Sequence, residues 1–265
     1  MTELQVIILA IVQGLTEFLP ISSSGHLVLV PFFFGWADQG IAFDVAVHFG
    51  SLIAVLLFFR QDIKGLIRGG VQLLGANTST IESRLALGIL LGTIPAAMAG
   101  LLLVDWIEAN LRSPIVIVGT LSGYAVLMII ADRFGKRTHG ISDMTIQRAL
   151  MIGVAQALAL VPGTSRSGVT ITLARFLGFE RQDAARFSFL LAVPVILLAT
   201  AFSLLNLARS EEAVAWGQLA LGVIVSAVVA YLSIEFFMRF VSRIGLLPFA
   251  IYRLLLAAVI VYVVV

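Results

Sequence analysis

The chain has 265 residues, of which 60% are hydrophobic and 12% charged, and its mean hydropathy is +1.07. Soluble domains carry about 25% charged residues, so the charges here are too few to cover a water-facing globule, and the composition predicts an integral membrane protein. Cysteine is absent, which excludes disulfides, thiolate nucleophiles and metal sites built on cysteine. The net charge of +2 gives no reason to expect nucleic acid as a partner.

Long apolar runs, without the alternation of a transmembrane barrel, predict α-helices that cross the membrane. We expect one all-α membrane domain over residues 1–265, with six crossing helices. Their expected limits are Ile41–Phe59, Leu85–Val104, Ser113–Ala131, Phe187–Leu207, Trp216–Phe237 and Leu246–Val265. The first residues, Met1–Leu4, lack a basic stretch ahead of the apolar run, so we expect no cleaved signal peptide.

Two further apolar stretches are interrupted by polar loops. Their arms are Leu4–Leu19 and Leu27–Phe34 around the loop 20–26, then Ala149–Val161 and Val169–Leu177 around the loop 162–168. At about 1.5 Å per residue, the second arm of the first stretch is ~12 Å long, against a hydrocarbon core of ~30 Å, so it cannot cross alone. We therefore predict two re-entrant helix-loop-helix hairpins; the alternative is a pair of proline-kinked spans.

The two broken stretches match each other residue by residue. Sliding the chain by 143 residues superposes identical residues, among them Gln13 on Gln156, Leu15 on Leu158, Ser22 on Ser165, Ser24 on Ser167, Gly25 on Gly168, Phe33 on Phe176, Gly35 on Gly178, Gln39 on Gln182 and Ala42 on Ala185. Chance similarity between apolar stretches would not favour the polar positions. We interpret the pattern as an internal duplication, with repeat one at about 1–132 and repeat two at about 146–265.

The lysines and arginines fall on two sides if each hairpin returns to the face that it entered. Thirteen then lie on one side, namely Arg60, Lys64, Arg68, Arg84, Arg133, Lys136, Arg137, Arg148, Arg175, Arg181, Arg186, Arg239 and Arg243. The other side has Arg112 and Arg209, with the acidic residues Asp105, Glu108, Glu211 and Glu212. The positive-inside rule places the first set in the cytoplasm and both termini outside. Three spans between the two copies invert the second copy.

The two polar loops are candidates for a functional site, because irregular backbone at membrane depth is tolerated only inside protein or around a wet cavity. Inverted copies bring the loop tips together near the midplane. The side chains that they would supply are Glu17, Ser22, Ser23, Ser24 and His26 from the first copy, and Ser165, Arg166, Ser167 and Thr170 from the second. The serines and glycines of the loops would let a phosphate oxygen approach the backbone closely. Gly25, Gly163, Thr164 and Gly168 complete the set of residues that we expect to bind the substrate.

The chemistry of these loops points to phosphate. Each loop opens a short helix whose unpaired N–H groups and dipole favour an anion, and Arg166 adds a forked, permanently charged donor. The structural alternative is that serine and threonine only cap the short helices. That alternative leaves Arg166, Glu17 and His26 without a reason to lie in the membrane, where each is costly.

Several roles stay open for the individual side chains. Glu17, one turn after Gln13, could accept a proton, orient His26, help to hold a divalent cation, or only form an ion pair with Arg166. The attacking group could be His26, or Ser23 or a neighbouring serine activated by His26 or Glu17.

His48 is a polar residue within the first full span. We favour a local hydrogen bond with Asp44, one turn earlier on the same face, over contact with a substrate.

The segments Gln13–His26 and Pro162–Gly168 closely resemble the two motifs of the bacterial undecaprenyl pyrophosphate phosphatase family, UppP, also called BacA. The resemblance extends over essentially the whole chain. It implies hydrolysis of undecaprenyl pyrophosphate to undecaprenyl phosphate and inorganic phosphate at the outer face of the cytoplasmic membrane, which recycles the lipid carrier for peptidoglycan synthesis. It also implies tolerance to bacitracin, which sequesters the same lipid.

The family's motif residues carry over as Glu17, Ser22, Ser23 and His26, and as Ser165, Arg166, Ser167 and Thr170. The resemblance further implies stimulation by a divalent cation, Mg²⁺ or Ca²⁺, with Glu17 as the metal ligand. Family members commonly have a second glutamate where this chain has Gln13, which weakens a site with two carboxylates.

The expected partners are a polyprenyl pyrophosphate lipid and membrane lipids, and the sequence leaves a homodimer open. The rival class is a secondary transporter or lipid flippase for a phosphorylated substrate, because inverted repeats with broken helices are a transporter architecture. A third class is a non-catalytic membrane scaffold, which would tolerate alanine at Glu17, His26 and Arg166 together.

Overall fold

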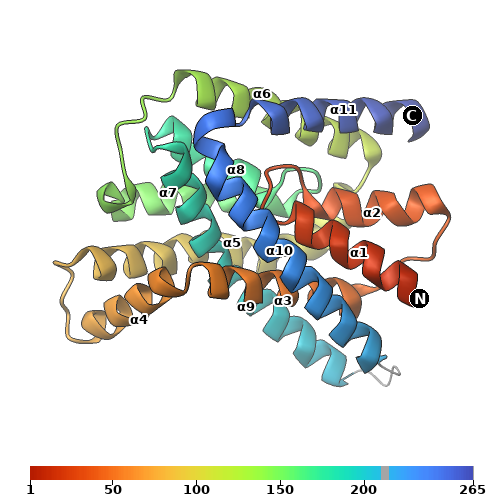
Figure 1. Ribbon diagram of the computed structural model, residues 1–265, viewed down its shortest axis with the longest axis horizontal. Helices are drawn as coiled ribbons and strands as arrows, with labels where there is room; N and C mark the ends of the chain where they lie inside the picture. Colours follow the sequence, from red (N-terminus) through yellow and green to blue (C-terminus); the bar gives the residue numbers. More distant parts are fainter. Residues whose placement is uncertain (210–214, 265) are drawn as a thin grey trace.

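A computed structural model of the chain describes residues 1–209 and 215–264, and over that part of the chain it is helical without strands (Figure 1). The helices are α1 (Glu3–Thr16), α2 (Ser23–Phe34), α3 (Ile41–Phe58), α4 (Arg60–Leu74), α5 (Ile81–Asn110), α6 (Pro114–Phe134), α7 (Ile146–Ala157), α8 (Arg166–Phe176), α9 (Arg181–Arg209), α10 (Trp216–Ile244) and α11 (Leu247–Val264), with 3₁₀ turns η1 (Ile141–Asp143) and η2 (Leu158–Leu160). The all-α prediction is confirmed. Glu211 and Glu212, and the side chains of Asp105, Glu108 and Arg209, lie outside what the structure describes.

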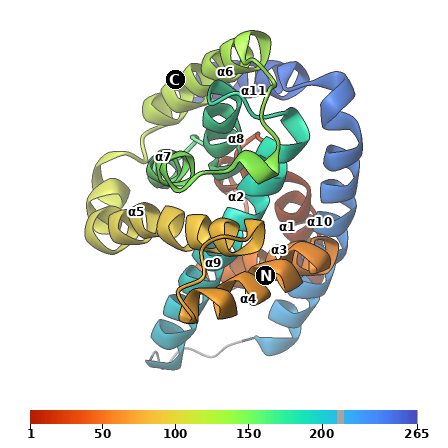
Figure 2. The ribbon, with the colours of Figure 1, turned by 90° about the vertical axis from the view of Figure 1, so that its left-hand side faces the viewer.

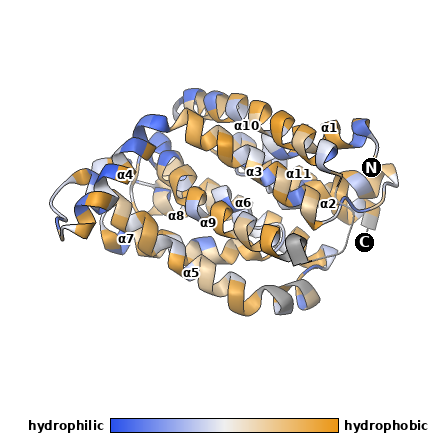
Figure 3. Cartoon of the chain, turned by 90° about the horizontal axis from the view of Figure 1, so that it is seen from below, coloured by the Kyte–Doolittle hydropathy of each residue, from blue (hydrophilic) through white to orange (hydrophobic). Residues whose placement is uncertain are grey.

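Five of these helices are long and apolar enough to cross a membrane, namely α3, α5, α6, α9 and α10. The sixth expected span corresponds to α11, whose segment Leu247–Val263 is apolar but shorter. Hydrophobic residues cover most of the length of the helices, and hydrophilic residues gather at the end where α4 lies (Figure 3). The protein is therefore a multi-pass membrane protein.

The helix α4 was not expected, because its fifteen residues lie in a segment that we took as a basic loop. Its apolar residues fall on one face, as in an amphipathic helix, and it packs against α5. A scan for long apolar runs misses such a helix.

The two broken stretches form hairpins. Helices α1 and α2 are joined by residues 17–22, and α7 and α8 are joined by η2 and residues 161–165. The outer ends of α1 and α2 lie at the end of the molecule that holds both termini, whereas α7 and α8 open toward the opposite end (Figure 1).

Packing between the helices follows one pattern in both halves of the chain. Helix α10 packs against α1 and α3, and α5 packs against α7 and α9. Helices α6 and α11 lie side by side, as α3 and α9 do (Figure 2). Small residues permit the close crossings, since a Cβ atom at Gly14 of α1 would lie 2.8 Å from the carbonyl oxygen of Ser226 in α10.

An aromatic core lies beneath the two loops. The buried rings of Phe18 and Phe189 meet edge to face with their centroids 5.1 Å apart, and Phe59 and Phe237 extend the cluster. Phe18 directly follows Glu17, so packing of its ring fixes the backbone of the first loop against α9.

The thirteen cations were expected in loops, but eleven of them lie in helices, and only Lys136 and Arg137 lie between helices. One of the eleven is also buried. Arg175 is fully buried in α8, where it contacts the carboxylate of Asp132 at 3.4 Å. Asp132 also accepts two hydrogen bonds from Arg181, at 2.7 and 2.8 Å. The charge of Arg175 is thus part of a structural ion-pair network.

Candidate active site

The two loops meet at Glu17, which is 7% exposed. Its Oε1 atom accepts a hydrogen bond of 2.9 Å from Nη2 of Arg166, the first residue of α8 directly after the second loop. Its Oε2 atom accepts hydrogen bonds from the Ser23 hydroxyl at 2.7 Å and from the Gln13 amide at 3.0 Å. The prediction that the hairpins bring Glu17 and Arg166 together is confirmed.

Arg166 is held from three directions and still has surface access. Besides Glu17, it donates to the carbonyl of Ser188 at 3.2 Å, and its guanidinium lies 5.5 Å from the centre of the Phe18 ring. The side chain is 12% exposed. Ser23 is also partly exposed and Ser24 is exposed, so a ligand can reach a cation and two hydroxyls at one place.

The serines that the repeat superposes adopt the same unusual backbone. Ser22 has a φ of 76° and Ser165 a φ of 70°, which is the left-handed region that residues other than glycine rarely occupy. Each begins a matching pair of hydroxyls, with 3.4 Å between Ser22 and Ser24 and 3.3 Å between Ser165 and Ser167. Strain at two equivalent positions is typical of functional sites.

Helix capping explains only part of the serine pattern. Ser165 caps α8 by accepting from the N–H of Gly168 at 3.1 Å, whereas Ser22 makes no side-chain cap at α2. A Cβ atom at Gly168 would lie 3.1 Å from the Ser165 hydroxyl, and one at Gly25 would lie 3.5 Å from that of Ser22. The contact at Gly168 would be unusually tight, so glycine lets the first turn of α8 stay close to Ser165, whereas a Cβ atom at Gly25 would make an ordinary contact.

Other residues of the second loop and of the first turns of α8 hold the site in place through contacts inside the protein. Gly163 has a φ of +84°, and a Cβ atom there would lie 2.9 Å from the carbonyl oxygen of Ile117. Thr170 is buried and shares a hydrogen bond of 2.6 Å with Ser188, which holds Arg166. The Ser167 hydroxyl donates to the carbonyl of Leu19 at 3.0 Å and so ties the two loops together.

Thr164 is 1% exposed. Its hydroxyl has no hydrogen-bond partner among the residues that the structure describes.

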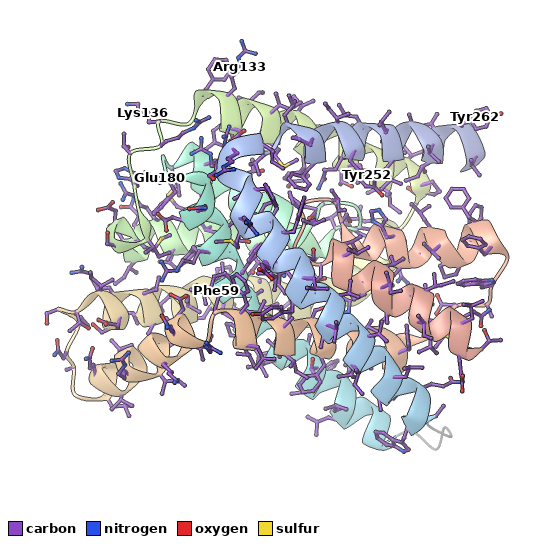
Figure 4. All side chains as sticks on the ribbon, viewed as in Figure 1. Phe59, Arg133, Lys136, Glu180, Tyr252 and Tyr262 are labelled. Carbon is purple, nitrogen blue, oxygen red and sulfur yellow. The ribbon has the colours of Figure 1, made fainter. Side chains whose placement is uncertain are left out.

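His26 binds Ser22 and Tyr252, whereas orientation of its ring by Glu17 was one of the roles left open for that carboxylate. Its Nδ1 lies 2.7 Å from the carbonyl of Ser22, so Nδ1 is the donor and carries hydrogen. Its Nε2 lies 2.6 Å from the hydroxyl of Tyr252, and the two rings are stacked with centroids 5.6 Å apart. Tyr252 comes from α11 (Figure 4). These contacts favour a role for His26 in supporting the first loop over contact with Glu17.

His48 lies nearer to the site than the sequence indicated. The predicted local hydrogen bond is confirmed, at 2.7 Å from Nδ1 to the backbone carbonyl of Asp44. The Asp44 carboxylate instead accepts from Gln39 at 2.8 Å. The Nε2 atom of His48 lies 3.5 Å from Oε2 of Glu17, so this partly exposed ring borders the carboxylate. A histidine inside an apolar span was the signal for this placement.

The donor set does not fit a divalent cation held by the protein alone. Among the described residues no group of three histidine, aspartate or glutamate side chains could hold a metal. Glu17 is the carboxylate at the loops, and both of its oxygens already accept hydrogen bonds from Arg166, Ser23 and Gln13. A cation would need further oxygens from the ligand itself.

Two residues of α11 were missed by the sequence reasoning. Tyr252 binds His26, and Arg253 is fully buried against both loops. They lie more than 80 residues beyond the second loop, in a segment that reads as an ordinary span. The signal that could have found Arg253 is an arginine within an apolar run.

Fold and site together define a class: a multi-pass membrane protein in which two strained serine loops meet at a carboxylate–guanidinium pair, an arrangement suited to binding and processing an anionic group. Comparison with known proteins identifies the family. The family model described as "Bacitracin resistance protein BacA" matches residues 6–259, and the chain belongs to this family.

Its relatives are similar over nearly their whole length. A protein of Hahella chejuensis named undecaprenyl-diphosphatase is 53% identical over 258 residues, 97% of each chain. One of the same name from Nitrosococcus oceani is 50% identical over 262 residues, 99% of each chain. Undecaprenyl-diphosphatase 2 of Stutzerimonas stutzeri is 52% identical, covering 98% of this chain and 97% of its own.

Proposed function

We propose that this protein hydrolyses undecaprenyl pyrophosphate to undecaprenyl phosphate and inorganic phosphate. The observation that carries the proposal is the Glu17 carboxylate, which accepts hydrogen bonds from a hydroxyl of the first hairpin and a guanidinium of the second. The names of the relatives support the same activity. They favour an enzyme over a transporter or flippase.

In the proposed mechanism the Ser23 hydroxyl attacks the terminal phosphorus. Glu17 takes the hydroxyl proton, because the Ser23 oxygen is 2.7 Å from its Oε2. A bond forms between the serine oxygen and phosphorus, the bond from phosphorus to the bridging oxygen breaks, and the lipid monophosphate leaves. Arg166 stabilises the charge on the transferred group. Water then cleaves the phosphoserine, which releases inorganic phosphate and restores the hydroxyl.

The test is release of phosphate from the C55 lipid pyrophosphate by the purified protein in detergent. An enzyme releases phosphate there without a membrane gradient, whereas a carrier only moves its substrate between the sides of sealed vesicles. Stoichiometric formation of the lipid monophosphate would support the proposal. Absence of phosphate release by folded protein would refute it.

The attacking group can be identified by trapping. With substrate labelled in the terminal phosphate, we expect an acid-stable phosphoserine in a quenched reaction of the wild type and none in Ser23→Ala. Ser24→Ala, which changes the neighbouring exposed hydroxyl, and His26→Ala should both retain the label. An acid-labile label that disappears in His26→Ala would identify the histidine as nucleophile instead.

We also propose the membrane layout: six spans, with α11 as the sixth, and two re-entrant hairpins in an inverted repeat. Three observations support it. Helix pairs related by the repeat pack alike, as α1 on α10 and α7 on α5 do. Ser22 and Ser165 share a positive φ. Lys136 lies at the opposite end of the molecule from Tyr262 near the C-terminus (Figure 4). The basic end would face the cytoplasm, with the active site and both termini outside.

Single cysteines test this orientation, since the chain has none of its own. The protein is expressed in a bacterium with two membranes, whose outer membrane is made permeable while the cytoplasmic membrane stays intact. In these cells Ala37→Cys, between α2 and α3, should react with a maleimide that cannot cross the cytoplasmic membrane. Thr78→Cys, between α4 and α5, should react only after lysis. Both positions are exposed. The reverse pattern, or equal labelling of both, would contradict the proposed layout.

A divalent cation, Mg²⁺ or Ca²⁺, stays a proposal, with Glu17 as its one protein ligand and the diphosphate supplying the other oxygens; we derive no step through it. Gln13→Glu would place a second carboxylate beside Glu17, and a cation would relieve the repulsion. We expect the ratio of rates with Mg²⁺ and with EDTA to rise by about tenfold in Gln13→Glu, corresponding to about 1.4 kcal/mol. Gln13→Ala, which adds no charge, should keep the wild-type ratio; an unchanged ratio in Gln13→Glu would contradict cation binding here.

A further inference from the structure

Arg253 of α11 contacts both loops, although it belongs to neither. Its side chain is fully buried. The guanidinium donates to five backbone carbonyls at 3.0 to 3.4 Å, those of Pro20 in the first loop, Gly163 and Thr164 in the second, and Thr120 and Leu121 in α6. A single side chain therefore fixes three separate segments of the chain relative to one another.

The acceptors of Arg253 distinguish it from a structural ion pair. Arg175, near the C-terminal end of α8, is buried to the same extent as Arg253, but it contacts the Asp132 carboxylate. The acceptors of Arg253 are neutral carbonyls, and no carboxylate among the described residues forms an ion pair with it. Because a buried charge is costly without a carboxylate partner, an arginine here needs a benefit beyond filling space.

The hydrogen bonds of Arg253 set the direction of a peptide N–H in the second loop. In a planar trans peptide the C=O and N–H groups point in opposite directions. The carbonyl of Thr164 points at Arg253 with a distance of 3.0 Å, so the N–H of Ser165, in the same peptide, points away from the guanidinium. That N–H lies next to those of Arg166 and Ser167 in the first turn of α8, where an α-helix offers its N–H groups no partner within the helix.

The loop that Arg253 holds is strained. Ser165 has a φ of 70°, and a residue in this region costs of the order of 1–3 kcal/mol, which the surroundings must offset. Both peptides directly before Ser165 are bound by Arg253, through the carbonyls of Gly163 and Thr164 at 3.0 Å. Loss of these bonds would let the loop relax and turn Arg166 away from Glu17.

We propose that Arg253 is a positioning residue for the phosphatase reaction, which holds both loops in register so that Ser23, Glu17 and Arg166 meet. The proposal rests on the proposed function. Among the described residues Arg253 binds backbone carbonyls and makes no hydrogen bond to Ser23, Glu17 or Arg166. Its effect should therefore fall on the rate of the chemical step, since misplacement by about 1 Å can lower a rate by about 100-fold.

The test compares Arg253→Lys with Arg175→Lys, two substitutions of the same kind at equally buried positions. We expect Arg253→Lys to lower kcat by about 100-fold and to raise amide hydrogen exchange in peptides covering both residues 17–25 and residues 159–168. Arg175→Lys should lower the melting temperature but keep kcat within about threefold of wild type, with unchanged exchange in those loops. Arg253→Gln, which keeps two N–H donors without the charge, is the second variant if the lysine variant does not fold.

Each result decides the question. A folded Arg253 variant with wild-type kcat would overturn the proposal, as would a kcat that falls only in proportion to the loss of folded protein. Faster exchange in one loop but not in the other would refute a shared anchor. If the wild type released no phosphate, the proposed function would fail, and the exchange measurements would still report whether Arg253 holds the loops.

Discussion

Arg166→Lys is expected to lower phosphate release by about 10³-fold without unfolding the protein. The guanidinium donates to Glu17 through Nη2 and to the Ser188 carbonyl through Nη1. Its other N–H groups make no further hydrogen bond among the described residues and could reach a phosphate. Lysine carries the same charge on a single nitrogen, so it cannot keep both contacts and hold two phosphate oxygens at once. The measurement is kcat in detergent, with the melting temperature recorded in parallel.

The control for this substitution is Arg186→Lys. Arg186 forms an ion pair with Asp62 of α4 and not with a residue of either loop. Replacement of its guanidinium by an ammonium group should therefore change kcat by less than about threefold. If Arg166→Lys also kept kcat within that range, Arg166 would not be part of the phosphate site and the proposed mechanism would fail.

Glu17→Gln is expected to lower kcat by about 10³-fold, because an amide cannot take the proton of Ser23. The substitution keeps the shape of the side chain, and its carbonyl oxygen can still accept from Arg166. A purely structural role predicts a different outcome: a lower melting temperature with a nearly normal rate, since breaking a buried ion pair costs about 3–5 kcal/mol. Turnover and thermal unfolding of the same preparation separate the two.

Glu82→Gln is the matched control for that change. Glu82 is exposed in the first turn of α5, so the same loss of charge there should leave the rate unchanged. Near-normal turnover of Glu17→Gln would mean that the carboxylate serves only to hold Arg166, and Ser23 would need another base. His48, 3.5 Å from Glu17, would then be the next candidate.

The sequence predicted what depends on local pattern. Apolar runs marked the long helices, the polar interruptions marked both loops, and the internal match of Ser22 with Ser165 corresponds to a shared backbone conformation. The meeting of Glu17 with Arg166 was predictable because a buried carboxylate and a buried guanidinium, each costly alone, stabilise each other when paired.

Contacts that depend on packing could not be predicted. His26 binds Tyr252, 226 residues away in the chain, and nothing in the spacing of either motif specifies that partner. Arg253 lies in an apolar segment whose hydropathy predicts a span and says nothing of the five carbonyls around its side chain. Arg175 was counted with the loop cations because charge is assigned from sequence position, whereas its burial follows from the contact of α8 with α6.

The two halves of the chain contribute different chemical groups to the site. The repeat that superposes Ser22 on Ser165 also superposes Glu17 on Leu160, Ser23 on Arg166 and His26 on Val169. The first hairpin thus contributes the carboxylate and the hydroxyl, and the second hairpin contributes the guanidinium. A symmetrical pair of first halves would bring two carboxylates together without a guanidinium. A pair of second halves would bring two guanidinium groups together without a carboxylate. Because the two halves are joined in a single polypeptide, they can differ in sequence, and one site can hold a carboxylate, a hydroxyl and a guanidinium. The protein then has one such site instead of the two equal sites that identical halves would form.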